Sequence, residues 1–166
     1  MTRIVPMNRP VDPVVAKFQQ KFGLPERPVS EIPSLPNFLD ELPDNKLMSL
    51  YSEFMAWVSY AKADYVQAEI AEERAANQLR ITESMVLITQ WGTKEKGDTV
   101  TLAKAHRDIN PEVIEAQTVY SECRAYRKLV ESVFERCERG AQVLSRELSR
   151  RIGLAPKEYK QARYIS

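Results

Sequence analysis

The length, composition and charge of the chain indicate a single folded domain and exclude several classes of protein. With 166 residues, of which 43% are hydrophobic and 28% charged, the chain can bury one core of its own and has the balance of a soluble folded protein rather than a disordered one. Its formal net charge is only +1, and no apolar run approaches the ~20 residues of a membrane span.

The N-terminus and the two cysteines favour a cytoplasmic protein. The stretch MTRIVPMNRP has no continuous apolar segment and holds two prolines, so no secretory signal is expected. Cys123 and Cys137 lie 14 residues apart in one helical pattern. That spacing corresponds to about 21 Å along a straight helix, which is too far for a disulfide bond. We therefore expect free thiols in a reducing compartment.

Residues 1–43 form a Pro-rich arm, since eight of the ten prolines precede residue 44. Asp12, Pro13 and Gly23 match the N-cap, the first residue and the stop of a short helix. The apolar face of this helix would consist of Val14, Val15, Phe18 and Phe22. The following LPERPVSEIPSLP should be extended, because proline lacks an amide donor and restricts the residue before it, and PNFLDEL should add a second short helical turn.

We interpret the arm as a strap that covers part of another surface. It would lay Phe18, Phe22, Phe38 and Leu39 on the helical body or on a neighbouring molecule. The alternative interpretation is a peptide-like recognition motif.

Residues 44–153 are predicted to form a helical body, which begins with a long helix from the capping residue Asp44 to Gly92. Apolar or small side chains recur along it at alternating spacings of three and four, as in a heptad seam. The seam comprises Leu47, Tyr51, Phe54, Val58, Ala61, Tyr65, Ala68, Ala75, Leu79 and Val86. Its small middle residues would let a partner helix approach closely. Trp57 and Trp91 fall off this stripe or at its end, and we expect them to pack against the arm or the following loop.

A second long helix follows a short connection. WGTKEKGDT is predicted to be a turn or short loop, and TVTLAKAHRD a short strand or a helix, with the helix favoured. Asn110, Pro111 and Glu112 then supply a capping side chain, a preset φ and a carboxylate at the positive end of the helix dipole. The helix should run to Arg151 or Ile152 and stop at Gly153. Its seam comprises Val113, Ala116, Tyr120, Cys123, Val130, Phe134, Cys137, Ala141, Leu144, Leu148 and Ile152.

These elements predict an all-α fold in which two long antiparallel helices form a helical hairpin, with the Pro-rich arm before it and a basic tail, residues 154–166, after it. Helices of roughly 40 residues would each be about 60 Å long, and a lone pair would bury only one stripe of each helix. We therefore expect the hairpin to complete its core as a homo-oligomer.

No catalytic motif is found in the sequence. His106 is the only histidine, and the HRD at 106–108 lacks every other part of a kinase motif set; no GxGxxG, GxxxxGK[ST] or CxxC is found. Glu69, Glu72 and Glu73 share one turn, but a solvated acidic face is favoured over a metal site because no Glu-x-x-His pair accompanies them. The cysteines fit the core rather than a reactive site. We expect no enzyme activity, no cofactor and no metal.

Positive charge is concentrated at the end of the chain. Residues 1–44 carry a net −1, 45–90 −2, 91–110 +1, 111–138 −2, and 139–166 +5 from seven basic and two acidic residues. The helix dipole favours cations only in the last turn, whereas this cluster extends further and is interleaved with Tyr159 and Tyr164. Basic side chains with aromatic residues suit a nucleic acid; an acidic protein surface and a solvated helix end are the alternatives.

Two groups of residues are therefore candidates for nucleic-acid binding. The main group comprises Arg139, Arg146, Arg150, Arg151, Lys157, Lys160 and Arg163. A weaker group in and after the central loop comprises Lys94, Lys96, Lys104 and Arg107, with His106 beside them.

The body over roughly residues 46–152 resembles the phage recombination mediators of the UvsY type. The likeness lies in a long helix beginning near NKLMSLYSEFMAWVSYAKADYVQAEIAEERAANQLR, a charged Gly-containing loop, an AKAHRD-like segment, and a second long helix with an arginine-rich end. The resemblance implies an α-helical homo-oligomeric ring that binds single-stranded DNA and helps to load a recombinase. It also implies DNA contacts at Arg74 and Arg80, although Glu72 and Glu73 stand beside Arg74.

The expected function is a non-enzymatic, oligomeric accessory protein of phage DNA recombination or replication, which binds single-stranded DNA and assists recombinase loading in the cytoplasm of the host cell. The alternative is a structural or assembly protein, such as a virion component or a host-directed interaction module, that uses the arm and the helical body for protein contacts. A regulator that docks on a host protein by helix-in-groove contact is a third hypothesis.

Overall fold

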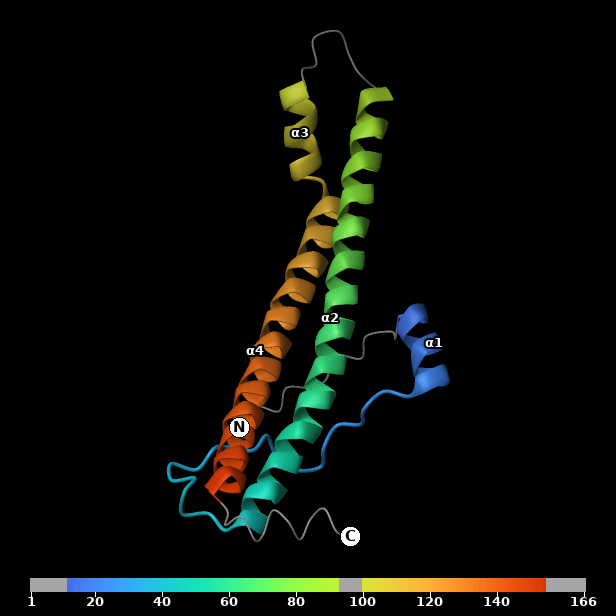
Figure 1. The fold of residues 1–166 in the computed structure, drawn as a ribbon. Helices are drawn as coiled ribbons and strands as arrows, with labels where there is room; N and C mark the ends of the chain where they lie inside the picture. Colours follow the sequence, from blue (N-terminus) through green and yellow to red (C-terminus); the bar gives the residue numbers. More distant parts are fainter. Residues whose placement is uncertain (1–11, 93–99, 155–166) are drawn as a thin grey trace. The chain divides into compact units, whose positions relative to one another are not determined.

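The computed structural model describes residues 12–92 and 100–154, and these ranges contain four helices and no strand. The two long helices pack against each other, which confirms the all-α prediction (Figure 1). The helices are α1 (Pro13–Phe22), α2 (Asp44–Gly92), α3 (Val100–Asp108) and α4 (Pro111–Leu154).

The chain divides into two units, each with its own segments of the long helices. Unit 1 combines residues 1–25 with 66–127, and unit 2 combines residues 26–65 with 128–166. Within unit 2, Asp44 pairs with Arg151 and Tyr65 stacks on Phe134, so α2 and α4 run antiparallel there.

The ends of α1 are set by the predicted residues. The Asp12 carboxylate accepts a 2.8 Å hydrogen bond from the Val14 amide, Pro13 is the first helical residue, and Gly23 follows the helix with φ 72°, a conformation that glycine adopts without steric cost. The predicted packing of its apolar face is different. Val15 is buried, but Phe18 and Phe22, on the same side of the helix, are 50% and 66% exposed. The helix is attached near its start, where Asp12 pairs with Arg74 of α2.

The rest of the described arm, residues 26–43, is called the strap here. The predicted short helical segment at PNFLDEL is not a helix. The strap instead makes one non-helical turn there, closed by a hydrogen bond from the Leu42 amide to the Leu39 carbonyl at 3.3 Å. The prolines that flank PNFLDEL leave no room for a longer helical run. Leu39 packs on the core of unit 2 as predicted, whereas Phe38 remains 64% exposed.

The start and end of the long helices fall close to the predicted residues. Asn110 caps α4 by accepting a 2.9 Å hydrogen bond from the Glu112 amide. Asp44 lies inside the first turn of α2 instead of capping it, since the Pro43 carbonyl accepts from the Leu47 amide at 3.0 Å. The predicted stop at Gly153 is wrong by one residue: α4 continues to Leu154, because Gly153 does not adopt a positive φ. The favoured helix at TVTLAKAHRD is confirmed as α3.

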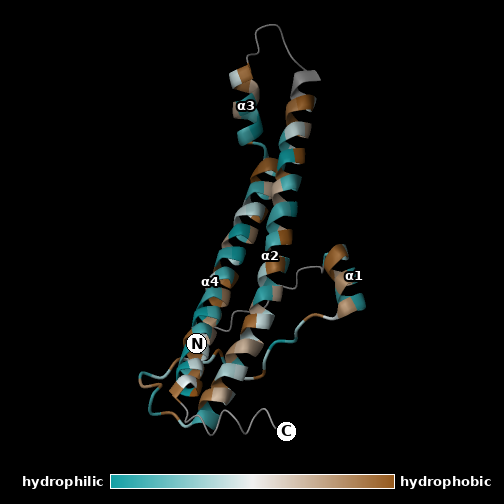
Figure 2. Ribbon diagram, in the orientation of Figure 1, coloured by the Kyte–Doolittle hydropathy of each residue, from teal (hydrophilic) through white to brown (hydrophobic). Residues whose placement is uncertain are grey.

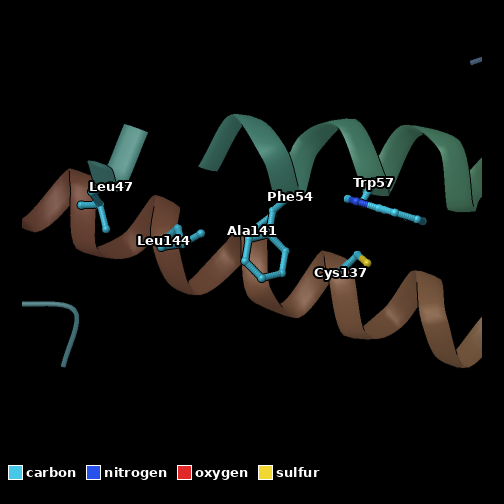
Figure 3. Close-up of a cluster of buried hydrophobic side chains, with 6 residues drawn as sticks. All are labelled: Leu47, Phe54, Trp57, Cys137, Ala141 and Leu144. Atoms are coloured by element: carbon cyan, nitrogen blue, oxygen red, sulfur yellow. The ribbon is translucent and has the colours of Figure 1, made fainter. Parts of the chain in front are cut away.

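The core of unit 2 joins α2, α4 and the strap (Figure 3). It consists of the buried side chains Leu47, Phe54, Trp57, Cys137, Ala141 and Leu144, with Ile32, Leu39 and Leu42 of the strap packed against them. Trp57 contacts the arm as predicted, since the Arg27 guanidinium lies 5.8 Å from its ring centre. It is also part of the core, and its Nε1 has no hydrogen-bond partner among the described residues.

The core of unit 1 is built from smaller side chains. Ala68, Ala75 and Val86 of α2 and Val113 and Cys123 of α4 are buried, and the Glu72 carboxylate pairs with Arg127. The two predicted seams are therefore the packed faces of α2 and α4 in both units. Ile152 is the exception, at 54% exposed, because it lies in the last turn of α4.

None of the helices in the described part of the chain combines the length and hydropathy that crossing a bilayer requires.

Gly140 permits a close contact between α2 and α4 in unit 2. A Cβ at this position would lie 2.3 Å from Cε1 of the Phe54 ring, far inside van der Waals contact. Helical propensity alone would favour alanine here, so Gly140 is present for packing. Since Phe54 is fully buried, its ring has little freedom to move away.

The substitution Gly140→Ala is expected to lower the free energy of unfolding by roughly 1–3 kcal/mol, because overpacking forces the Phe54 ring or the helices to shift. Urea denaturation followed by circular dichroism measures this. Gly153→Ala is the matched control, since nothing lies within 4 Å of its added Cβ, and it should be neutral or slightly stabilising. Equal destabilisation by both variants would contradict the packing role of Gly140.

Candidate nucleic-acid interface

Four arginines line the outward face of α4 in unit 2. Arg136, Arg139, Arg146 and Arg150 are all exposed, and their spacings of three, seven and four residues place them on one side of a helix. The buried residues Cys137, Ala141 and Leu144 lie on the opposite side, against α2. At ~1.5 Å per residue, this arginine stripe is about 21 Å long.

The stripe keeps most of its charge accessible to solvent. Arg139 pairs with Glu135 at 2.8 Å, and Arg150 binds both oxygens of Glu147 at 2.7 Å, but the two arginine side chains remain 75% and 53% exposed. Such exposed pairs are weak because water and salt screen them. Residues 139–154 hold four basic residues and one acidic residue, a net +3, so the end of α4 is basic even with these pairs formed.

Arg151 has a different environment from its neighbour Arg150. Its guanidinium has five N–H donors, and five acceptors surround it. Nε donates to Glu147 at 2.8 Å, Nη1 to the Leu42 carbonyl and to Asp44, both at 2.6 Å, and Nη2 to the carbonyls of Leu39 at 2.7 Å and Asp40 at 3.2 Å. Arg151 therefore ties the strap to the end of α4, an arrangement called the Arg151 clamp below, and has no donor left for a phosphate.

Glu147 holds the two arginines in place. Hydrogen bonds from Arg150 and Arg151 lower the pKa of Glu147 to about 2, from an ordinary value of 4.5. The same contacts raise the pKa of both guanidinium groups. The carboxylate thus stays ionised over the physiological range and orients Arg151 toward the strap.

The other predicted candidates fall elsewhere. Lys157, Lys160, Arg163, Lys94 and Lys96 lie outside the described residues. Lys104 and His106 are exposed on α3, which belongs to unit 1, and Arg107 donates to Asp108 at 2.8 Å. These α3 residues belong to unit 1, whereas the arginine stripe belongs to unit 2.

Arg74, which the resemblance suggested as a DNA contact, is engaged within unit 1. Its Nε lies 2.5 Å from the carboxylate of Asp12, the N-cap of α1, and its side chain remains 50% exposed. Arg80 is exposed and stays a prediction.

Sequence reasoning missed Arg136. Its distances of three, ten and fourteen residues from Arg139, Arg146 and Arg150 are the signal that could have found it, because each is close to a whole number of helical turns. The net charge of its segment does not reveal it, because residues 111–138 are negative overall.

The candidate metal-binding and thiol residues of the described part have these environments. The described residues contain no group of three or more potential metal-binding side chains, and Glu72 is engaged by Arg127. Both cysteines are buried free thiols, as predicted, and burial raises the pKa of the Cys137 thiol, which disfavours the reactive thiolate.

Comparisons of the chain with protein-family models, with curated protein sequences and with solved structures give no significant match.

Replacing Arg151 with lysine should loosen the strap, because an ammonium group has three donors and cannot reproduce the planar fork that reaches five acceptors. We expect faster cleavage after Glu31 and Glu41 by a glutamate-specific protease. Arg146→Lys is the matched control and should be cleaved at the wild-type rate. Equal cleavage of both variants would show that the Arg151 clamp does not hold the strap.

The clamp is also expected to weaken in acid. Because the folded-state pKa of Glu147 lies below its unfolded value, its stabilisation is present above about pH 4.5 and is lost as the pH falls toward 2. Urea midpoints of the wild type and of Glu147→Gln should therefore differ at about pH 5 and converge at about pH 2. If the two urea midpoints differ by the same amount at both pH values, the ionised Glu147 carboxylate does not stabilise the clamp.

Proposed function

We propose that this protein is a non-enzymatic, oligomeric accessory protein of phage DNA recombination or replication, and that it binds single-stranded DNA through the arginine stripe of α4. The observation that carries the proposal is the placement of four exposed arginines on the one face of α4 that packing does not use. Assistance in recombinase loading is part of the proposal and comes from the resemblance to the UvsY-type mediators.

The physical argument starts from the cost of clustering positive charge. Arginines along one helix face repel one another, and the ion pairs found among residues 12–92 and 100–154 relieve this repulsion at Arg139 and Arg150. A polyanion relieves the repulsion along the whole stripe and releases the counterions condensed on its phosphates. A guanidinium group can also donate two parallel hydrogen bonds to two oxygens of one phosphate, and it can stack on an unpaired base. A single strand of DNA exposes both its phosphates and its bases, and it can follow a narrow row of arginines.

The stripe requires no movement of the strap. Arg151 stays in the clamp, and the exposed ion pairs of Arg139 and Arg150 can exchange a carboxylate for a phosphate. On α4, the proposed surface therefore differs from the predicted cluster by one exchange: Arg136 takes the place of Arg151, so the surface extends further toward the middle of the helix.

Fluorescence anisotropy of a labelled single-stranded oligonucleotide tests the proposal. If all four arginines of one protomer contact phosphates, the log–log dependence of affinity on salt should have a slope of about −2.8 per protomer from the stripe. The triple variant Arg139→Gln/Arg146→Gln/Arg150→Gln should reduce the magnitude of this slope by about 2 and weaken binding at low salt.

A control with the same change in net charge separates a local site from a general charge effect. Lys46→Gln/Lys62→Gln/Arg124→Gln removes three exposed cations away from the stripe and should bind nearly as well as the wild type. If the two triple variants bind equally, or if the wild type does not bind at low salt, the arginine stripe is not a DNA surface.

The second candidate function is a structural or assembly protein, and the exposed aromatic side chains of α1 favour it. Under this alternative the stripe would meet an acidic protein surface. The anisotropy experiment separates the two, because an assembly protein gives no salt-dependent binding to the oligonucleotide.

A further inference from the structure

The short helix α1 carries an apolar stripe that no described residue covers. Val14, Phe18 and Phe22 recur every four residues and are 58%, 50% and 66% exposed. The two aromatic rings contact each other, with centres 5.0 Å apart, and Figure 2 shows hydrophobic stretches along the helix. An apolar surface that faces water in this way marks an interaction site.

The N-terminal end of α1 is attached to unit 1. Val15 is 6% exposed, and Asp12, the N-cap, pairs with Arg74 of α2 at 2.5 Å. Val15 lies on the same side of the helix as Phe18 and Phe22, but this side is buried only near the start of α1, and the two rings stay 50% and 66% exposed. The stripe is thus available to another molecule without any rearrangement of α1.

Unit 1 also contains an open groove between α2 and α4. Its volume is about 280 Å³, and it is lined by Ala75, Gln78, Thr82, Glu112, Glu115, Ala116 and Val119. The small side chains Ala75 and Ala116 leave the space. Ile81 and Met85 lie three and seven residues after Gln78, hence on the same side of α2, and both are more than half exposed, so the apolar surface continues beyond the groove.

The size of the groove suits protein side chains better than a small molecule. Pockets for small ligands usually measure about 300–1,000 Å³ and are largely enclosed, whereas this groove is smaller and open. Helix-in-groove recognition instead uses apolar anchors spaced one turn apart, which is the pattern of the stripe on α1.

The charges of the two surfaces are complementary. Alongside its stripe, α1 carries Lys17 and Lys21 and no acidic residue, and both lysines are exposed. The lining of the groove contains Glu112 and Glu115 and no basic residue. Opposite charges around an apolar contact favour one partner and one orientation.

We infer that α1 of one copy docks into this groove of a second copy of the chain. Both surfaces occur in every copy, so two molecules related by a two-fold axis make the contact twice, as in an isologous dimer. The aromatic rings would fill the space above Ala75 and Ala116, and the lysines would pair with Glu112 and Glu115. The inference rests on the oligomeric part of the proposed function and does not depend on DNA binding.

A reciprocal charge exchange tests this docking. Lys17→Glu/Lys21→Glu should weaken self-association by about tenfold or more, because like charges then face each other, and Glu112→Lys/Glu115→Lys should do the same. Combining the four substitutions in one chain should restore association. Sedimentation velocity over a range of concentrations measures the effect, and circular dichroism checks that each variant is folded. Lys46→Glu/Lys128→Glu is the control with an equal change in charge and should associate normally.

Cysteine cross-linking identifies the partner surface. A Phe18→Cys variant mixed with a Val119→Cys variant should form a disulfide-linked heterodimer, whereas Phe38→Cys mixed with Val119→Cys should not. A monomeric wild type, an unrestored four-fold variant or equal cross-linking of both mixtures overturns the inference.

This result is independent of the DNA experiment, because none of the exchanged residues belongs to the arginine stripe. Loss of DNA binding in the stripe variant would leave the sedimentation behaviour unchanged.

Discussion

The contact between Phe54 and the backbone of α4 at Gly140 sets how α2 and α4 pack in unit 2. Because no Cβ is present at Gly140, the ring lies against the helix itself, and the neighbouring side chains Leu47, Leu144 and Cys137 close around it without leaving exposed edges. Buried apolar side chains contribute most of the stability of such a pair, and their complementary shapes select one register.

The strap depends on that core and on one polar contact. Ile32, Leu39 and Leu42 bury apolar surface on the helices, and Arg151 donates to three carbonyls of this compact turn, those of Leu39, Asp40 and Leu42. A single guanidinium does this well because its five donors are coplanar and rigidly spaced. The clamp divides the basic end of α4 into two parts: Arg151 stabilises the fold, while the remaining arginines point outward and are available for binding.

Much of the secondary structure was predictable because local chemistry determines it. Asp12 with Pro13 and Asn110 with Pro111 mark helix starts wherever they occur, and the alternation of three and four marked Ala68, Ala75 and Cys123 as seam residues. The site was less predictable. Arg136 was hidden by the acidic residues near it in sequence, and the role of Arg151 depends on Leu39 and Asp44, which lie more than a hundred residues away in the chain. The apolar face of α1 was recognised, but burial of Val15 instead of the phenylalanine rings is decided by where along its length the helix is attached.

By itself, therefore, the sequence determined the helices, their ends within a residue or two and the stripes by which α2 and α4 pack, because caps, prolines and periodicity act over a few residues. The tertiary structure alone decided which charges are engaged and which are free, which glycine is required by a ring from another helix, and which apolar side chains stay exposed. Those properties depend on distances between segments far apart in the chain, and no local pattern encodes such distances.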